Sequence, residues 1–264
     1  MSNQPNVILI TTDGSEHSLH VVPHAEAFAS ARGAGTVLVE IVEASQHDAA
    51  TGAGVINASL KDGESVPEAI VRVATEQGAG MIAMDTRGHG AIHHAVQGST
   101  ALDVLAKTAL PVMLTGAHLV EGVPAAEPYR LVVTSDGSPA SEDVIRALAP
   151  LLTPGRFAVT LLRIHERDAN VVAEASELAE CEAQLNSLRP LFQTGLEVQT
   201  RVREIARLGG VDTAIIEEAQ SLGAGAIATS THGVSAARHL FAGSVALLLL
   251  GRSPLPVIMA RGDH

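Results

Sequence analysis

Short apolar runs alternate with amphipathic stretches along the whole chain. Residues 7–10 and 131–133 are apolar and largely β-branched, and each run leads into Asp-Gly-Ser and then into a helical pattern. Nearly continuous apolar strands separated by helices are typical of a parallel sheet that is covered on both faces. The pattern therefore predicts an α/β protein built on doubly wound, Rossmann-like parallel sheets.

The same order of elements is expected twice. Each copy contains a first strand, a helix, two more strands, a helix, a fourth strand, a glycine-bearing loop, a helix and a last strand. The later strands are expected at 37–42, 55–60, 81–84 and after Leu110, and at 159–164, 196–202, 226–229 and after Leu255. The helices that follow are expected at 67–76 and from Ser99, and at 212–220 and from Ser244.

An internal repeat accounts for this duplication. Asp13 and Asp136 lie 123 residues apart, and Ile41 and Ile164 keep this offset. Matched glycine-containing blocks farther along lie 145 residues apart, so the second copy carries 22 extra residues in its middle. Those residues fall at 171–191, where helical spacing of Leu predicts an additional helix.

Two tandem domains follow from the repeat. We expect the first at residues 1–120 and the second at 125–264, with a linker at 117–128 that is rich in Gly and Pro. In the first copy, residues 44–54 form a Gly, Ala and His stretch in place of the extra helix. The first domain is therefore expected to be shortened in its middle, with a loop there.

Composition excludes several classes of function. A formal net charge of −12 and only four Phe, one Tyr and no Trp argue against nucleic-acid binding. Cys181 is the single cysteine, which excludes an intrachain disulfide and a cysteine-based zinc or redox site. Neither a signal peptide nor a membrane-spanning segment is expected, so we predict a cytoplasmic protein.

The loop after the fourth strand carries the candidate chemistry. In both copies a Gly is followed by nine residues and then by a Gly-Ser pair at the start of a helix. Glycine lets backbone N–H groups approach an anion closely, and the first N–H groups of a helix bind phosphate. The same residues also fit a plain turn and N-cap. Neither copy has a Walker lysine, so the loop is not a P-loop.

Taken together, the Asp-Gly-Ser turn, this loop and the Pro-Val final strand resemble the universal stress protein family, over nearly the whole chain and as a tandem pair. The ATP-binding branch of that family has Gly, two residues, Gly, nine residues, Gly, then Ser or Thr. This sequence keeps the second and third glycines and the Ser in both copies. At the first glycine it has Asp85 in the first copy and Ser230 in the second.

The resemblance implies a fold like that of the adenine nucleotide α-hydrolases and a ligand, ATP, bound with Mg²⁺. The strand-end aspartate and the backbone after the second strand would hold the adenosine, and the loop would hold the ribose and triphosphate. The residues so assigned are Asp136, Ile164, Ser230, His232, Gly233, Gly243, Ser244 and Val245 in the second copy, and Asp13, Ile41, Gly88, Gly98, Ser99 and Thr100 in the first. His232 is expected to donate a hydrogen bond to a phosphate.

Single-domain members of the family pair through their last strands, which here include residues 111–114 and 256–259. The resemblance therefore implies an intrachain pseudo-dimer with approximate two-fold symmetry. Pairing would cover two apolar strands that would otherwise be open sheet edges. A higher homo-oligomer is also compatible with the sequence.

Asp85 places a carboxylate where phosphates are expected, which costs energy unless a cation lies between. Three roles are open for it: a ligand of Mg²⁺, a partner of Arg87, or a residue that caps the turn. Two groups of histidines have a spacing that permits metal binding. The stronger interpretation is that one group lies on a solvated helix face and the other in a polar loop. These groups are His17, His20 and His24, and His89, His93 and His94.

The expected function is that of a stress-response protein that binds ATP as a regulatory ligand and acts on an unknown protein partner. A slow ATPase and an interaction module with vestigial nucleotide sites are the alternatives. Regulatory ATP binding is favoured over these alternatives because no general base or arginine clamp is evident in the sequence. The second copy is expected to be the stronger site, since it has Ser230 in place of Asp85.

Overall fold

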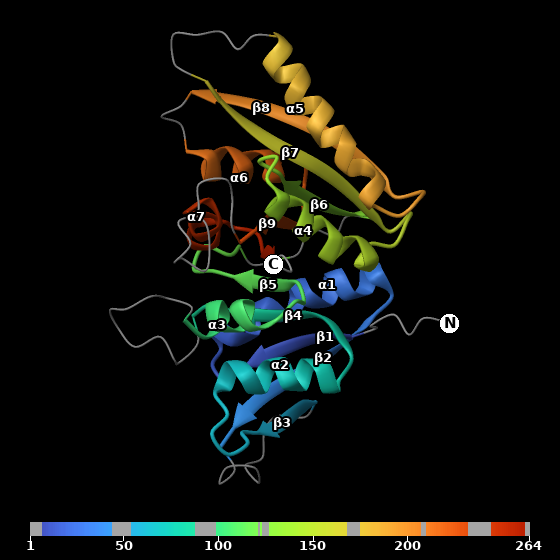
Figure 1. Ribbon diagram of the computed structural model, residues 1–264. Helices are drawn as coiled ribbons and strands as arrows, with labels where there is room; N and C mark the ends of the chain where they lie inside the picture. Colours follow the sequence, from blue (N-terminus) through green and yellow to red (C-terminus); the bar gives the residue numbers. More distant parts are fainter. Residues whose placement is uncertain are drawn as a thin grey trace.

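The computed structural model describes residues 7–43, 54–87, 99–120, 122, 127–167, 175–206, 210–231 and 244–261. Figure 1 shows the two halves of the chain one above the other, with the first half in blue to green and the second in yellow to red. Each half alternates strands and helices, as the apolar pattern predicts.

The elements of the first half are β1 (Val7–Thr12), the 3-10 helix η1 (His17–Val21), α1 (Val22–Arg32), β2 (Gly35–Val42), β3 (Val55–Ser59), α2 (Val66–Glu76), β4 (Ala79–Asp85), α3 (Ser99–Lys107) and β5 (Val112–Thr115). Those of the second half are β6 (Tyr129–Thr134), α4 (Pro139–Leu148), η3 (Ala149–Leu151), β7 (Phe157–Arg167), α5 (Ala175–Leu188), η4 (Arg189–Leu191), β8 (Glu197–Ala206), α6 (Val211–Ser221), β9 (Ala226–Ser230), α7 (Ser244–Arg252) and β10 (Val257–Ala260). The strands and helices predicted from the sequence are confirmed, and α5 is the additional helix of the second copy.

Within the described residues, ten strands form one sheet in the order β3-β2-β1-β4-β5-β10-β9-β6-β7-β8. Pairing is parallel within each half, and the halves join where β5 runs antiparallel to β10. Ile258 lies opposite Met113 at the centre of that junction. The predicted pairing of the two last strands is therefore confirmed, and β3 and β8 are left at opposite ends of the sheet (Figure 1).

Two hydrophobic clusters, one for each face of the sheet, extend across both halves. One cluster holds the buried side chains of α1, α4 and α5, and the other those of α2, α3, α6 and α7. Strand residues alternate between them, since Ile8 and Ile10 belong to the first cluster and Leu9 to the second. The inner strands are buried on both faces and are therefore mostly apolar, whereas the outer strands β3 and β8 are partly exposed.

Side chains from both halves also meet beside the sheet. The rings of Phe28 in α1 and Phe157 in β7 are centred 5.1 Å apart, and Tyr129 contacts both. Arg156 donates a hydrogen bond of 3.0 Å to the carbonyl oxygen of Ser30 near the end of α1. Helix α1 is therefore held by the second half as well as by its own.

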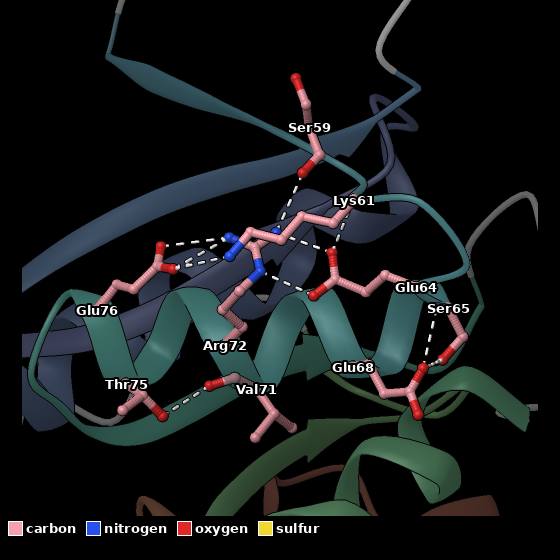
Figure 2. Close-up of polar contacts among 9 residues, drawn as sticks. All are labelled: Ser59, Lys61, Glu64, Ser65, Glu68, Val71, Arg72, Thr75 and Glu76. Atoms are coloured by element: carbon pink, nitrogen blue, oxygen red, sulfur yellow. Dashed lines mark hydrogen bonds and ion pairs between the residues drawn. The ribbon is translucent and has the colours of Figure 1, made fainter.

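Polar contacts fix the start of α2 (Figure 2). The Ser65 hydroxyl and backbone N–H donate to Glu68, forming a capping box. These two bonds, together with a hydrogen bond from Lys107, lower the pKa of Glu68 to about 2. Arg72 donates to Glu64 at 2.7 Å and lowers the pKa of that carboxyl to about 2. Both carboxylates therefore stay ionised through the ordinary pH range.

The first helix differs between the halves. In the second half, Ser138 is the N-cap of α4 and accepts from the Ser141 N–H. In the first half, the residues after Asp-Gly-Ser form η1, and α1 starts only at Val22, with Pro23 in its first turn. The Ser15 hydroxyl accepts from the Ser18 N–H, so it caps a 3-10 turn rather than α1.

Two expectations about organisation stay predictions. The loop expected at residues 44–54 lies, except for Gly54, outside the described residues. The domain boundaries at 1–120 and 125–264 are also untested. Among the described residues, no helix has the length and apolar character needed to cross a membrane.

Candidate functional site

The candidate sites lie where the strand order reverses in each half. Strand β1 lies between β2 and β4, and β6 lies between β7 and β9. In sheets of this type, ligands bind outside the carboxyl ends of the strands at the point where the strand order reverses. Of the predicted residues, Asp13 follows β1 directly, and Asp136 follows β6 after one residue, Ser135.

Each of these aspartates stabilises its own turn. Asp13 Oδ1 accepts from the N–H and the hydroxyl of Ser15, at 3.1 and 2.6 Å, and Asp136 Oδ1 accepts from the Ser138 N–H at 3.0 Å. The intervening glycines, which have φ of 77° and 81°, adopt the left-handed region that the turn requires. Both carboxylates are therefore held at the strand ends.

The second strand of each half extends beyond the first. The pairing of β6 with β7 ends at Thr134 and Leu162, whereas that of β7 with β8 continues to Arg167. Ile164 thus lies two residues past the last pair with β6. Ile41 likewise lies one residue past the last pair of β1 with β2. This is the position at which the family resemblance implies backbone contacts to the adenosine, which stays a prediction.

In the first half, the end of β4 is closed by a buried ion pair. The Asp85 side chain is 0% exposed, and its two oxygens accept from Nε and Nη2 of Arg87 at 3.0 and 2.8 Å. The Thr115 hydroxyl and the Arg87 backbone N–H also donate to it. Arg87 Nη2 donates in turn to His20 Nδ1 at 2.9 Å, because a guanidinium cannot accept.

The pairing of Asp85 with Arg87 and the capping of the turn, two of the three roles left open by the sequence, are thus confirmed. A magnesium ligand at Asp85 would require several of these bonds to break. Within the described part of the chain, no three His, Cys, Asp or Glu side chains gather as a metal site requires.

In the second half, uncharged residues occupy the matched positions. Ser230 stands where the first half has Asp85, and Ala260 where it has Thr115. The neighbouring Thr134 hydroxyl donates to the Thr229 hydroxyl at 2.9 Å, so neutral hydrogen bonds join the ends of β6 and β9. The end of β9 therefore has no counterpart of the carboxylate that Asp85 places on β4.

A further difference lies beside the two glycines of the Asp-Gly-Ser turns, and the sequence reading missed it. A β-carbon on Gly14 would lie 3.5 Å from Oε1 of Glu40, and one on Gly137 would lie 2.6 Å from Nη1 of Arg163. Glu40 and Arg163 keep the offset of the repeat and directly precede Ile41 and Ile164. Comparing the two copies position by position would have shown this reversal of charge.

The loop residues are described only in part. Ser99 and Thr100 begin α3, and Ser244 and Val245 begin α7, as predicted. The predicted residues Gly88, Gly98, His232, Gly233 and Gly243, together with His89, His93 and His94, lie outside the described residues. Their assignment to a nucleotide stays a prediction.

The three histidines expected on one helix face are separated by the fold. His17 and His20 lie in η1, with their rings centred 5.6 Å apart, and His20 bonds Arg87. His24 lies in α1 and is only 2% exposed. The expectation of a solvated face is therefore wrong for His24, because α1 packs that side chain into the protein interior.

The strand order, the parallel pairing within each half and the antiparallel junction define two Rossmann-like α/β units in tandem. The family model of the universal stress protein family matches residues 42–116 and 129–261. The chain therefore belongs to the universal stress protein family, as the sequence resemblance implied.

Solved structures of similar fold cover nearly the whole chain. A universal stress protein from Archaeoglobus fulgidus DSM 4304 is 17% identical, with a TM-score of 0.63 over 98% of this chain and 99% of that one. A putative universal stress protein from Pseudomonas aeruginosa UCBPP-PA14 is 15% identical, with a TM-score of 0.60 over 98% and 94%. At these identities the likeness supports the fold. No curated protein is significantly similar in sequence.

Proposed function

We propose that the chain binds an adenine nucleotide, ATP with Mg²⁺, as a regulatory ligand in stress signalling, and that the second half holds the working site. The observation that carries this proposal is the contrast at matched strand ends. The second half presents Ser230 and Arg163 where the first presents Asp85 and Glu40. An anion is favoured where the fixed charge is positive and opposed where it is negative.

The residues of the second half fit such a ligand. Asp136 can accept from an exocyclic amine or a ribose hydroxyl, and the backbone at Ile164 lies beyond the strand pairing with β6. Helix α7 begins at Ser244, where N–H groups without helical partners favour the phosphates. In the site, Mg²⁺ would screen the charge of the triphosphate.

The first half supports a different role. Because Asp85 and Arg87 neutralise each other and Arg87 also bonds η1, the end of β4 is occupied by the chain's own side chains. We expect this half to act as a structural or interaction module. The alternative of an interaction module with a vestigial nucleotide site would then apply to the first half alone.

Calorimetry of the purified full chain with ATP and GTP, each with Mg²⁺, tests the ligand, and mass spectrometry after denaturation shows whether nucleotide is already bound. We expect ATP to bind more tightly than GTP, and hydrolysis to be slow at most. Equal or absent binding of both nucleotides would contradict the proposal.

A matched pair of loop variants tests the half. Gly243→Val places a side chain in the proposed phosphate path of the second half and should remove most of the ligand-induced thermal shift, which reports binding by mass action. Gly98→Val makes the same change in the first half and should have little effect. The reverse result would place the working site in the first half.

A further inference from the structure

The Arg163 side chain lies against the turn that follows β6. Its Nη1 is 2.6 Å from the position that a β-carbon on Gly137 would take, so the guanidinium can lie there only because that residue is glycine. Arg163 also stands next to Ile164, beyond the last pair of β7 with β6. The guanidinium therefore lies beside the turn at the carboxyl end of β6.

The charge of this guanidinium is not matched by an acid among the described residues. Arg163 Nη1 donates to the neutral amide oxygen of Gln184 at 2.6 Å. Gln184 belongs to α5, the helix that the second copy has in addition, so α5 orients the guanidinium without neutralising it. Arg87 of the first half, by contrast, is paired with Asp85.

The type of side chain at this position has a known chemical consequence in α/β sheets. An acidic residue at the end of the second strand accepts from the hydroxyls of an adenosine ribose, whereas an arginine nearby accommodates a phosphate on that ribose. The planar guanidinium binds phosphate through two parallel hydrogen bonds. Glu40 in the first half is of the first type, and Arg163 is of the second.

We infer that the second half selects adenine nucleotides that carry a phosphate on the 2′- or 3′-hydroxyl of the ribose, and that Arg163 is the residue that determines this selectivity. The inference rests on the proposed nucleotide site and deepens it. The 5′-phosphates would lie toward the start of α7, and the ribose phosphate would be bound by Arg163. Gln184 acts as a positioning residue that holds the guanidinium over the turn.

Three isomers of equal composition test the inference: ADP, adenosine 3′,5′-bisphosphate and adenosine 2′,5′-bisphosphate. Calorimetry on the full chain should show at least one ribose-phosphorylated isomer binding about tenfold more tightly than ADP, since a hydrogen bond to a charged group is of that size. Equal affinities for ADP and both bisphosphates would overturn the inference.

Arg163→Gln should reduce the affinity ratio to about one, because it should weaken the bisphosphates much more than ADP, and Arg163→Lys should retain part of the ratio. A merely structural role would weaken all three ligands together and leave the ratio unchanged, which would also overturn the inference. Glu40→Gln is the matched control in the first half and should leave the ratio as it is.

The outcomes separate this inference from the proposed function. If ATP and ADP bind but the ribose phosphates add nothing, the inference fails and the proposed function stands. If the bisphosphates bind in an Arg163-dependent way but ATP does not, the proposal of ATP fails and the selectivity stands. If none of these nucleotides binds, both are wrong.

Discussion

The two halves of this chain share one strand order but differ in how they use charge at the ends of their central strands. In the first half, Asp85 is fully buried and bonds Arg87 and Thr115. In the second half, Ser230 and Ala260 occupy the matched positions. A duplicated scaffold can thus keep its packing while one half pairs a charge at the end of its fourth strand internally and the other has no charge at the matched position.

The side chains beside the Asp-Gly-Ser turns differ in the same direction. Glu40 lies beside Gly14, and Arg163 beside Gly137. Because Glu40 is negative and Arg163 positive, whereas Asp85 is already paired with Arg87, the charges beside these turns favour nucleotide binding in the second half. Each difference can be changed separately, which allows the comparison to be tested.

The largest expected effect is on stability and comes from Asp85→Ser, which gives the first half the residue that the second half has at the matched position, Ser230. Asp85→Ser removes the carboxylate that accepts from Arg87 and Thr115 and leaves a mostly buried guanidinium without its partner. We expect a loss of about 3 kcal/mol in the free energy of unfolding, measured with urea, since breaking a buried ion pair from one side costs this much.

Asp103→Ser, at an exposed position of α3, is the control and should change little. The reciprocal change, Ser230→Asp, should instead weaken ATP binding. An unfolding free energy of Asp85→Ser equal to that of the wild type would show that the ion pair does not stabilise the protein.

A second comparison concerns the ion pairs between the helices on one face of the sheet. Lys107 of α3 bonds Glu68 of α2 at 3.0 Å, and Arg252 of α7 bonds Asp212 of α6 at 2.9 Å. The side chain of Glu68 is 47% exposed but that of Asp212 only 3%. The same connection between helices is thus solvated in the first half and buried on its acidic side in the second.

Arg252→Met should therefore lower the free energy of unfolding by about 1.5 kcal/mol, because it leaves a buried carboxylate without its cation. Lys107→Met should lower it by less than about 0.5 kcal/mol, as is usual for exposed pairs. Urea unfolding of both variants measures the difference, and equal losses would show that burial of Asp212 does not distinguish the two pairs.

Much of this architecture was predictable from the sequence, because apolar runs and the repeat are local signals. The pairing of β5 with β10 followed from the family resemblance and from the need to cover two apolar strands. The contact of Arg87 with His20 joins residues 67 positions apart and depends on how η1 packs over the strand ends. No local pattern reports such a contact.

The burial of His24 was missed for a similar reason. Its spacing from His17 and His20 suggested one common helix face, but η1 changes the helical geometry before α1 begins. Side-chain direction therefore could not be taken from a uniform period of 3.6 residues. The reversal of charge between Glu40 and Arg163 was present in the sequence but gains meaning only from their contacts with the turns.

The smallest expected effect is a pH dependence that His24 gives to the first half and that Ala147, at the matched position, cannot give to the second. His24 Nδ1 is buried with no hydrogen-bond partner among the described residues, and burial lowers the pKa of this imidazole from its ordinary value of 6.5. The unfolded chain therefore binds a proton more readily than the folded one below that pH. Stability is fully present above pH 6.5 and declines as pH falls toward the lowered pKa, by about 1.4 kcal/mol for each unit of difference between the two pKa values.

His24→Leu keeps the side chain large and apolar and should flatten the decline of the unfolding free energy between pH 7 and pH 5. His118→Leu, at an exposed position, is the control and should leave the slope unchanged. Urea unfolding at each pH measures both slopes. An unaltered slope in His24→Leu would mean that the imidazole is protonated as easily in the folded protein as in the unfolded chain, and the two halves would then not differ in this respect.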